Sequence, residues 1–156
     1  MKKILCMLLT VTMMLSVVAC GSKEASAKPG DTMTLQEIVD AVLKDVDNLP
    51  EVMSVELDEN SFPYVAFVEK QDGMEGIASD ALINATAHSV VVVRTTDAAT
   101  AETVAKEMDV NKNPAKWVCV EAEKSQVVVH GSTILLVMSS AATADAIIAN
   151  FDALWA

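Results

Sequence analysis

The chain has 156 residues, of which 52% are hydrophobic, and its 11 basic and 22 acidic side chains give a formal net charge of −11. Because like charges repel, so acidic a chain is not expected to bind nucleic acid or to dock on anionic lipid headgroups through a basic patch. Residues 34–156 have the length of a single domain and contain no internal repeat.

The N-terminus has the charged and apolar regions of a signal peptide. Lys2 and Lys3 are followed by Ile4 to Ala19, a run of sixteen residues without charge. A permanent membrane span needs about 20 apolar residues, so this run is typical of a shorter secretory segment. The sequence therefore predicts a signal peptide over residues 1–19, which an exported protein loses.

The end of the apolar run reads Val17-Val18-Ala19-Cys20, which resembles the lipobox of bacterial lipoprotein precursors. The resemblance implies that Cys20 is lipidated and becomes the first mature residue, anchoring the chain to the extracytoplasmic face of the cell membrane. Two or three acyl chains hold a protein far more firmly than one, since each buried methylene contributes roughly 0.8 kcal/mol. The alternatives are an ordinary cleaved signal or an uncleaved anchor. Residues 20–33 are rich in Gly, Ser, Ala and Lys and predict a flexible tether.

Removing the signal peptide changes the charge and the cysteine count. The loss of two lysines leaves 9 basic and 22 acidic residues, a balance of −13. Cys6 leaves with the signal and Cys20 is lipidated, so Cys119 is the one thiol left and no disulfide can form within one mature chain. Cys119 stands in the apolar run 117–120, which predicts a buried, unreactive thiol.

Residues 34–156 are predicted to form one globular domain, and its first helix is the best supported element. Thr34 and Glu37 have capping-box spacing. Apolar residues then recur at helical spacing up to Leu49-Pro50, which ends the helix. The inward-facing positions are Leu35, Ile38, Val39, Val42, Leu43 and Val46.

The remaining elements follow from periodicity, β-branched runs and turn residues. Asp97 can cap one helix, and Ser139 or Ser140 can cap the last one. In chain order the prediction is two short extended pieces within 52–69, a helix over 74–84, a strand over 90–93, a helix after Asp97 that ends near 111–114, strands over 116–122, 126–130 and 133–138, and a C-terminal helix.

Several predicted strands are continuously apolar, including VVVV at 90–93 and ILLVM at 134–138. A strand with one wet face should alternate, so both faces of this sheet are expected to be covered. The predicted fold class is α+β, a mixed, mainly antiparallel sheet of about four strands covered by about four helices, in the order α-β-α-β-α-β-β-β-α. Alternatively, helices cover one face and a partner or ligand covers the other.

The segments AHSVVVVRTTD, KWVCV, GSTILLVMSS and IIANFDAL resemble a group of small, uncharacterised lipoproteins of anaerobic Firmicutes. The likeness extends over residues 34–156 and rests on apolar motifs. That group has no established activity, so the resemblance implies a lipid anchor and carries over no catalytic residue.

Catalytic and metal-binding patterns are weak in this sequence. A Ser/His/Asp hydrolase could use His88 or His130, but no Gly-x-Ser-x-Gly elbow or other spacing enforces the geometry. A zinc site of both histidines and Cys119 is equally unsupported. We expect no catalytic residue, metal or cofactor.

The irregular region 60–76 is the predicted recognition surface, because Phe62, Pro63 and Tyr64 are apolar residues in a loop-like context. These residues could instead pack over the sheet edge. The sequence thus favours a membrane-anchored, non-enzymatic module of the cell envelope that binds a protein partner. The alternative is a hydrolase-like envelope enzyme whose site the sequence does not reveal.

Overall fold

The computed structural model describes residues 27–156. The predicted signal peptide, 1–19, and the predicted lipidation site Cys20 lie outside these residues. The elements in chain order are α1 (Pro29–Thr32), α2 (Leu35–Leu43), β1 (Val52–Glu56), α3 (Phe62–Val65), β2 (Glu75–Ala81), β3 (Ser89–Arg94), α4 (Ala98–Asn111), β4 (Lys124–His130), β5 (Thr133–Ser139) and α5 (Ala141–Ala153).

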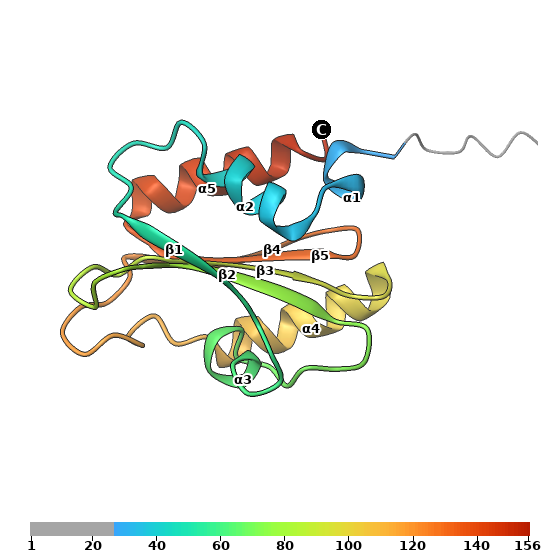
Figure 1. Ribbon diagram of the computed structural model, residues 1–156, viewed down its shortest axis with the longest axis horizontal. Coiled ribbons are helices and arrows are strands. Elements are labelled where there is room, and N and C mark those ends of the chain that lie inside the picture. The colour runs from blue at the N-terminus through green and yellow to red at the C-terminus, as the bar shows by residue number, and fades with distance from the viewer. Residues whose placement is uncertain (1–26) are drawn as a thin grey trace, which may run out of the picture.

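The five strands form one sheet in the order β1-β2-β3-β5-β4, and every neighbouring pair is antiparallel. Figure 1 shows α2 and α5 on one face of the sheet and α3 and α4 on the other. The predicted α+β class and the cover of helices on both faces are confirmed. The sheet has one strand more than predicted and is antiparallel throughout.

The central strand β3 explains the continuous apolar runs. Val90 and Val92 pack in the core beneath α2 and α5, whereas Val91 and Val93 pack in the core on the α3 and α4 side. All four valines have no exposed surface. Two covered faces remove the polar alternation that a half-exposed strand would show.

The predicted helix caps are confirmed. The Thr34 hydroxyl accepts a hydrogen bond from Glu37 N at 3.2 Å, and Thr34 N donates to the Glu37 carboxylate at 2.7 Å. Asp97 and Ser140 each accept from the backbone N–H three residues on, at the starts of α4 and α5. Each cap satisfies amides that the helix itself leaves unpaired. Helix α2 ends at Leu43, before the predicted stop at Pro50.

The helix predicted over 74–84 is wrong, because β2 occupies this segment. Met74, Ile77, Ala78 and Leu82 have helical spacing, yet Ile77 and Ala78 are buried in the cores on opposite faces of the sheet. An inner strand that is covered on both faces cannot be distinguished from a helix by the spacing of its apolar residues.

The strand predicted over 116–122 is also wrong, as is the second of the two extended pieces predicted within 52–69; the first is β1. Residues 116–122 form a loop in which Val118 is 89% exposed and Cys119 is exposed rather than buried. Ala122 N donates to Pro114 O within the same loop at 2.9 Å, and none of the five strands formed by residues 27–156 comes from this segment. Phe62–Val65 is a single helical turn with a proline in its first turn, where proline needs no backbone donor.

The folded part begins before the predicted boundary at Thr34. Helix α1 lies beside the C-terminus (Figure 1), where Gly30 N donates to Leu154 O at 3.0 Å and Trp155 Nε1 donates to Asp31 Oδ1 at 2.8 Å. A β-carbon on Gly30 would lie within 2.5 Å of the Trp155 ring. The missing side chain therefore makes room for the indole, a role that a search for apolar periodicity does not detect.

Candidate functional site: an open sheet edge

The two edges of the sheet differ in how helices cover them. At one edge, β4 has α4 packed against one face and α5 against the other. At the other edge, no helix of the described chain packs against β1 to a comparable extent. Figure 1 shows β1 crossing in front of the other strands. An uncovered edge strand can pair with another extended chain, which makes β1 the strongest candidate for a binding site.

The backbone of β1 presents hydrogen-bonding groups on its free side. Leu57 N donates to Gly76 O at 2.8 Å, and Glu51 O accepts from Leu82 N at 3.0 Å. In an antiparallel pair every second residue hydrogen-bonds to the neighbouring strand. Residues 53 and 55 therefore bond to β2, as 51 and 57 do. The N–H and C=O groups of Val52, Ser54 and Glu56 consequently point away from β2, toward the open edge.

The side chains of β1 add an apolar surface to this edge. Met53 is 57% exposed and Val55 is 50% exposed, both on the face that carries α3. They line a groove of about 200 Å³, here called the β1 groove, between α3 and the outer two strands. Its other lining residues are Leu57, Ser61, Val65, Ala78, Asp80, Ala81 and Leu82. Backbone groups and apolar side chains therefore face solvent together along one strand.

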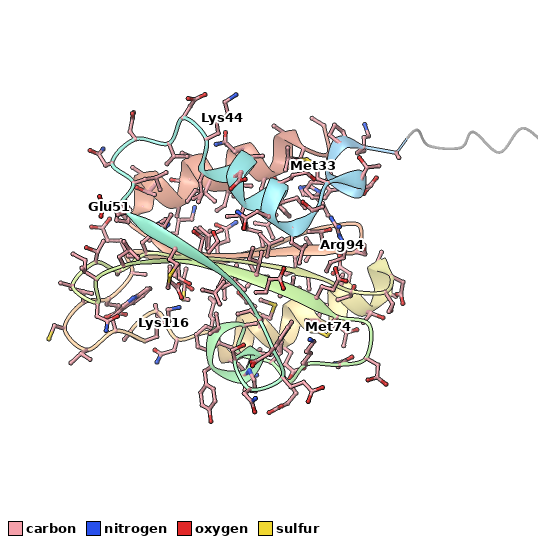
Figure 2. The ribbon with its side chains drawn as sticks, viewed as in Figure 1. Met33, Lys44, Glu51, Met74, Arg94 and Lys116 are labelled. Carbon is pink, nitrogen blue, oxygen red and sulfur yellow. The ribbon has the colours of Figure 1, made fainter. Side chains whose placement is uncertain are left out.

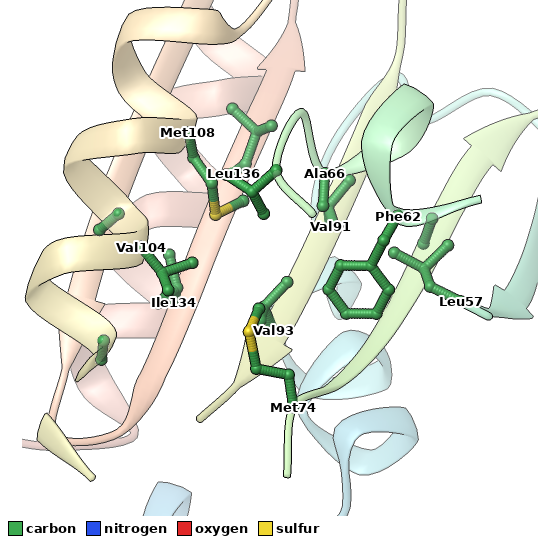
Figure 3. Packing of buried hydrophobic residues seen from close by; sticks show 14 of the residues in the cluster. Leu57, Phe62, Ala66, Met74, Val91, Val93, Val104, Met108, Ile134 and Leu136 are labelled. Carbon is green, nitrogen blue, oxygen red and sulfur yellow. The ribbon is translucent and has the colours of Figure 1, made fainter. Parts of the chain in front are cut away.

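The predicted recognition residues Phe62, Pro63 and Tyr64 separate in the structure. Phe62 is fully buried, and Figure 3 shows its ring pointing into the core near Leu57 and Val93. Pro63 is half-buried, and Tyr64 is 79% exposed. Phe62 is thus unavailable to a partner, whereas the neighbouring turn of α3 supplies one wall of the β1 groove.

Carboxylates flank the open edge. Glu51 precedes β1, Glu56 ends it and Glu59 follows three residues later, and all three are exposed. In the described part of the chain none of them forms an ion pair; the ion pairs there are made by Lys112, Lys116, Lys124 and His130. The ends of the edge therefore carry negative charge that no ion pair within residues 27–156 neutralises.

A larger cleft of about 480 Å³, lined by both polar and apolar residues, lies on the opposite face, between the start of α2, the end of β1 and the start of β2. Arg94 lines it, but its guanidinium already donates to Met33 O at 2.9 Å and to Gly30 O at 3.1 Å (Figure 2). Its Nε donates to the Thr133 hydroxyl at 3.3 Å. Arg94 is thus used to hold the N-terminal segment on the sheet.

The two histidines lie at opposite ends of β5. His88 is fully buried with Nδ1 3.0 Å from Ser139 Oγ, at the last residue of β5, and its Nε2 has no hydrogen-bond partner among the described residues. Desolvation by burial lowers the pKa of His88 below 6.5. His130 pairs with Thr133, the first residue of β5, and stacks on Trp155 with ring centroids 5.2 Å apart. At about 3.4 Å per residue, the strand holds the two imidazoles too far apart to share one site.

Residues 27–156 contain no group of three or more His, Cys, Asp or Glu side chains placed to bind a metal ion. Nor does any helix within that range have the length and apolar character needed to cross a bilayer.

Neither edge strand of the sheet had been singled out by the sequence as a binding site. The one usable signal was the short alternating piece around Met53 and Val55, since alternation predicts a strand with a solvent-exposed face.

Comparison with known proteins does not assign the chain to a family. No protein-family model, no curated protein and no solved structure matches the chain. The resemblance to small Firmicutes lipoproteins stays a prediction from the sequence.

Proposed function

We propose that the chain is a lipid-anchored binding protein on the extracytoplasmic face of a bacterial cell membrane, which binds a protein partner by adding one of the partner's segments to the edge of β1. The lipobox-like Val17-Val18-Ala19-Cys20 supports the anchor. The observation that carries the binding function is the uncovered edge of β1, with free backbone groups at Val52, Ser54 and Glu56 beside exposed Met53 and Val55.

Strand addition suits this edge for a physical reason. An added strand would lie about 4.8 Å from β1, and its backbone would satisfy donors and acceptors that have no partner within residues 27–156. The same strand would cover Met53 and Val55, whose apolar surface contributes roughly 25 cal/mol for each Å² removed from water. Hydrogen bonds set the register while burial of apolar surface supplies affinity.

The anchor is tested by labelling bacteria that produce the chain with an alkyne-bearing fatty acid. We expect the membrane fraction to contain a labelled protein whose intact mass corresponds to a lipidated residue 20. Cys20→Ser should abolish the label and leave the precursor uncleaved. An unmodified thiol at Cys20 in the wild-type protein, or a cytosolic wild-type protein, would refute the anchor.

The binding edge is tested by photo-crosslinking in the same cells. A photoreactive amino acid at position 53, on the edge, should give a crosslinked partner protein that is absent when the same amino acid replaces Glu107 on the exposed side of α4. Ser54→Pro removes an outward-facing N–H and places the proline ring in the path of an added strand, without removing a bond to β2. This substitution should abolish the crosslink.

The fold of the proline variant provides the internal control. Proline is tolerated in edge strands where the N–H faces solvent, so Ser54→Pro should unfold near the wild-type temperature. Val55→Pro, one residue on, removes a bond to β2 and leaves the facing carbonyl without its donor, so it should destabilise the domain by about 1–3 kcal/mol. A crosslink that persists in a folded Ser54→Pro protein would refute strand addition at β1.

A further inference from the structure

We propose that the partner segment bound by β1 is a basic, extended stretch of protein that adds antiparallel, with two aliphatic residues at alternating positions and a lysine or arginine near each end. This inference rests on the proposed function and specifies its ligand. It commits to a basic partner rather than to a second copy of this chain.

Charge favours the basic partner. The exposed carboxylates Glu51 and Glu56 stand at the two ends of the free edge, and Glu59 lies just beyond it, without ion pairs in the described structure. Lys70 lies near the Glu56 end of the edge, where it lines the 480 Å³ cleft together with Glu56 and Glu75. One lysine does not balance these carboxylates. The free edge therefore attracts cations at both ends.

The same charges oppose pairing of two copies. Each mature chain carries 9 basic and 22 acidic residues, a difference of −13. Two copies paired through β1 would bring both sets of flanking carboxylates into one sheet, where like charges repel. A basic segment would replace this repulsion with attraction at the same positions.

The register fixes the pattern of the segment. In an antiparallel addition, residues opposite Met53 and Val55 point to the face of the β1 groove, so aliphatic side chains fit there. The residue between them lies opposite Ser54 and bonds β1 through its own N–H and C=O. Residues opposite Glu56 and Glu51 complete the segment, and a basic side chain suits each. The heptapeptide TKVTVTK has this pattern when its central threonine lies opposite Ser54.

The probe is acetylated, amidated TKVTVTK at millimolar concentration, added at low salt to the chain that begins at residue 20 and carries Cys20→Ser. Two-dimensional amide NMR spectra report binding residue by residue. We expect the largest shifts at the outward-facing amides of Val52, Ser54 and Glu56. Each exposed charge pair, between a peptide lysine and Glu51 or Glu56, should raise the affinity a few-fold. The control peptide TEVTVTE, which has glutamate in place of both lysines, should therefore bind about tenfold more weakly. This difference in affinity should decrease as salt is added.

N-methylation of the peptide tests the direction of addition. Methylating the central threonine, whose N–H would face β1, should abolish binding, whereas methylating either valine should be tolerated. The reverse pattern, or tolerance at every position, would overturn antiparallel addition.

The outcomes separate this inference from the proposed function. Equal binding of TKVTVTK and TEVTVTE at the β1 amides would overturn the basic partner and leave strand addition standing. No shift of those amides with either peptide, or equal shifts in Ser54→Pro, would overturn both. Concentration-dependent shifts of the same amides without peptide would show a second copy as the occupant and overturn the basic partner.

Discussion

The burial of Phe62 leads to the sharpest stability prediction, because Tyr64 on the same turn of α3 is a matched exposed aromatic. Phe62 has no exposed surface and Tyr64 is 79% exposed. A buried phenylalanine removes about 150–250 Å² from water, which corresponds to roughly 4–6 kcal/mol at 25 cal/mol per Å². Alanine keeps part of that burial and the site relaxes partly, so Phe62→Ala should cost about 3–5 kcal/mol.

The assay is urea unfolding of the Cys20→Ser chain from residue 20, followed by far-ultraviolet circular dichroism. Small domains lose about 1–3 kcal/mol of stability for each mole per litre of urea, so a cost of about 3–5 kcal/mol in Phe62→Ala should lower the urea midpoint by about 1 M or more. Tyr64→Ala should change stability by less than about 0.5 kcal/mol. Similar losses in the two variants would refute the assignment of Phe62 to the core.

Gly76 provides a second test of the same packing. A β-carbon at Gly76 would lie 2.7 Å from Cζ of Phe62 and 3.2 Å from Cδ1 of Leu57. Gly76→Ala should therefore cost about 1–3 kcal/mol in the wild type through overpacking. In Phe62→Ala the added methyl enters the space that the ring has left, so the double mutant should be more stable than the sum of the single effects predicts. Additive losses would contradict the contact.

Three further predictions concern other parts of the fold. Gly30→Ala should displace the Trp155 indole, lowering the free energy of unfolding by about 1–3 kcal/mol and shifting the tryptophan fluorescence. Because burial lowers the pKa of His88, the unfolded chain binds a proton at His88 below about pH 6.5 while the folded chain does not, so the free energy of unfolding should fall with falling pH by up to about 1.4 kcal/mol per pH unit. Urea titrations at several pH values should show a shallower fall for His88→Gln. An unchanged slope in that variant would contradict the prediction. Asp97→Ala removes the cap of α4 and should lower the thermal midpoint by an amount equivalent to about 1 kcal/mol, whereas Glu102→Ala on the same helix should leave it within error.

The sequence determined the elements whose signals are local. Thr34 with Glu37, Asp97 and Ser140 mark helix starts because a short polar side chain caps amides only three residues away. The valines of 90–93 predict a strand because β-branched side chains favour an extended backbone and cannot all face water. The α+β class and the cover on both faces followed from these signals.

Tertiary structure decided what depended on distant partners. Residues 75–81 are a strand because 52–56 and 89–94 pair with them on either side, which the helical spacing of Met74, Ile77 and Ala78 could not reveal. Residues 117–120 are an apolar run but lie in a loop, outside the five-stranded sheet whose edge on that side is β4. Phe62 is in the core because Gly76, in another strand, leaves room for its ring.

The candidate site belongs to the same class of non-local features. The pattern of Met53 and Val55 predicts an exposed strand face, but the edge is open because β1 comes last in the strand order and no helix of residues 27–156 packs closely against it. Strand order is set by pairing between segments far apart in the chain, and local residue patterns do not encode it. Export and a lipid anchor are therefore predictions of the sequence alone, whereas the open edge of β1 on which the proposed binding depends appears only in the fold.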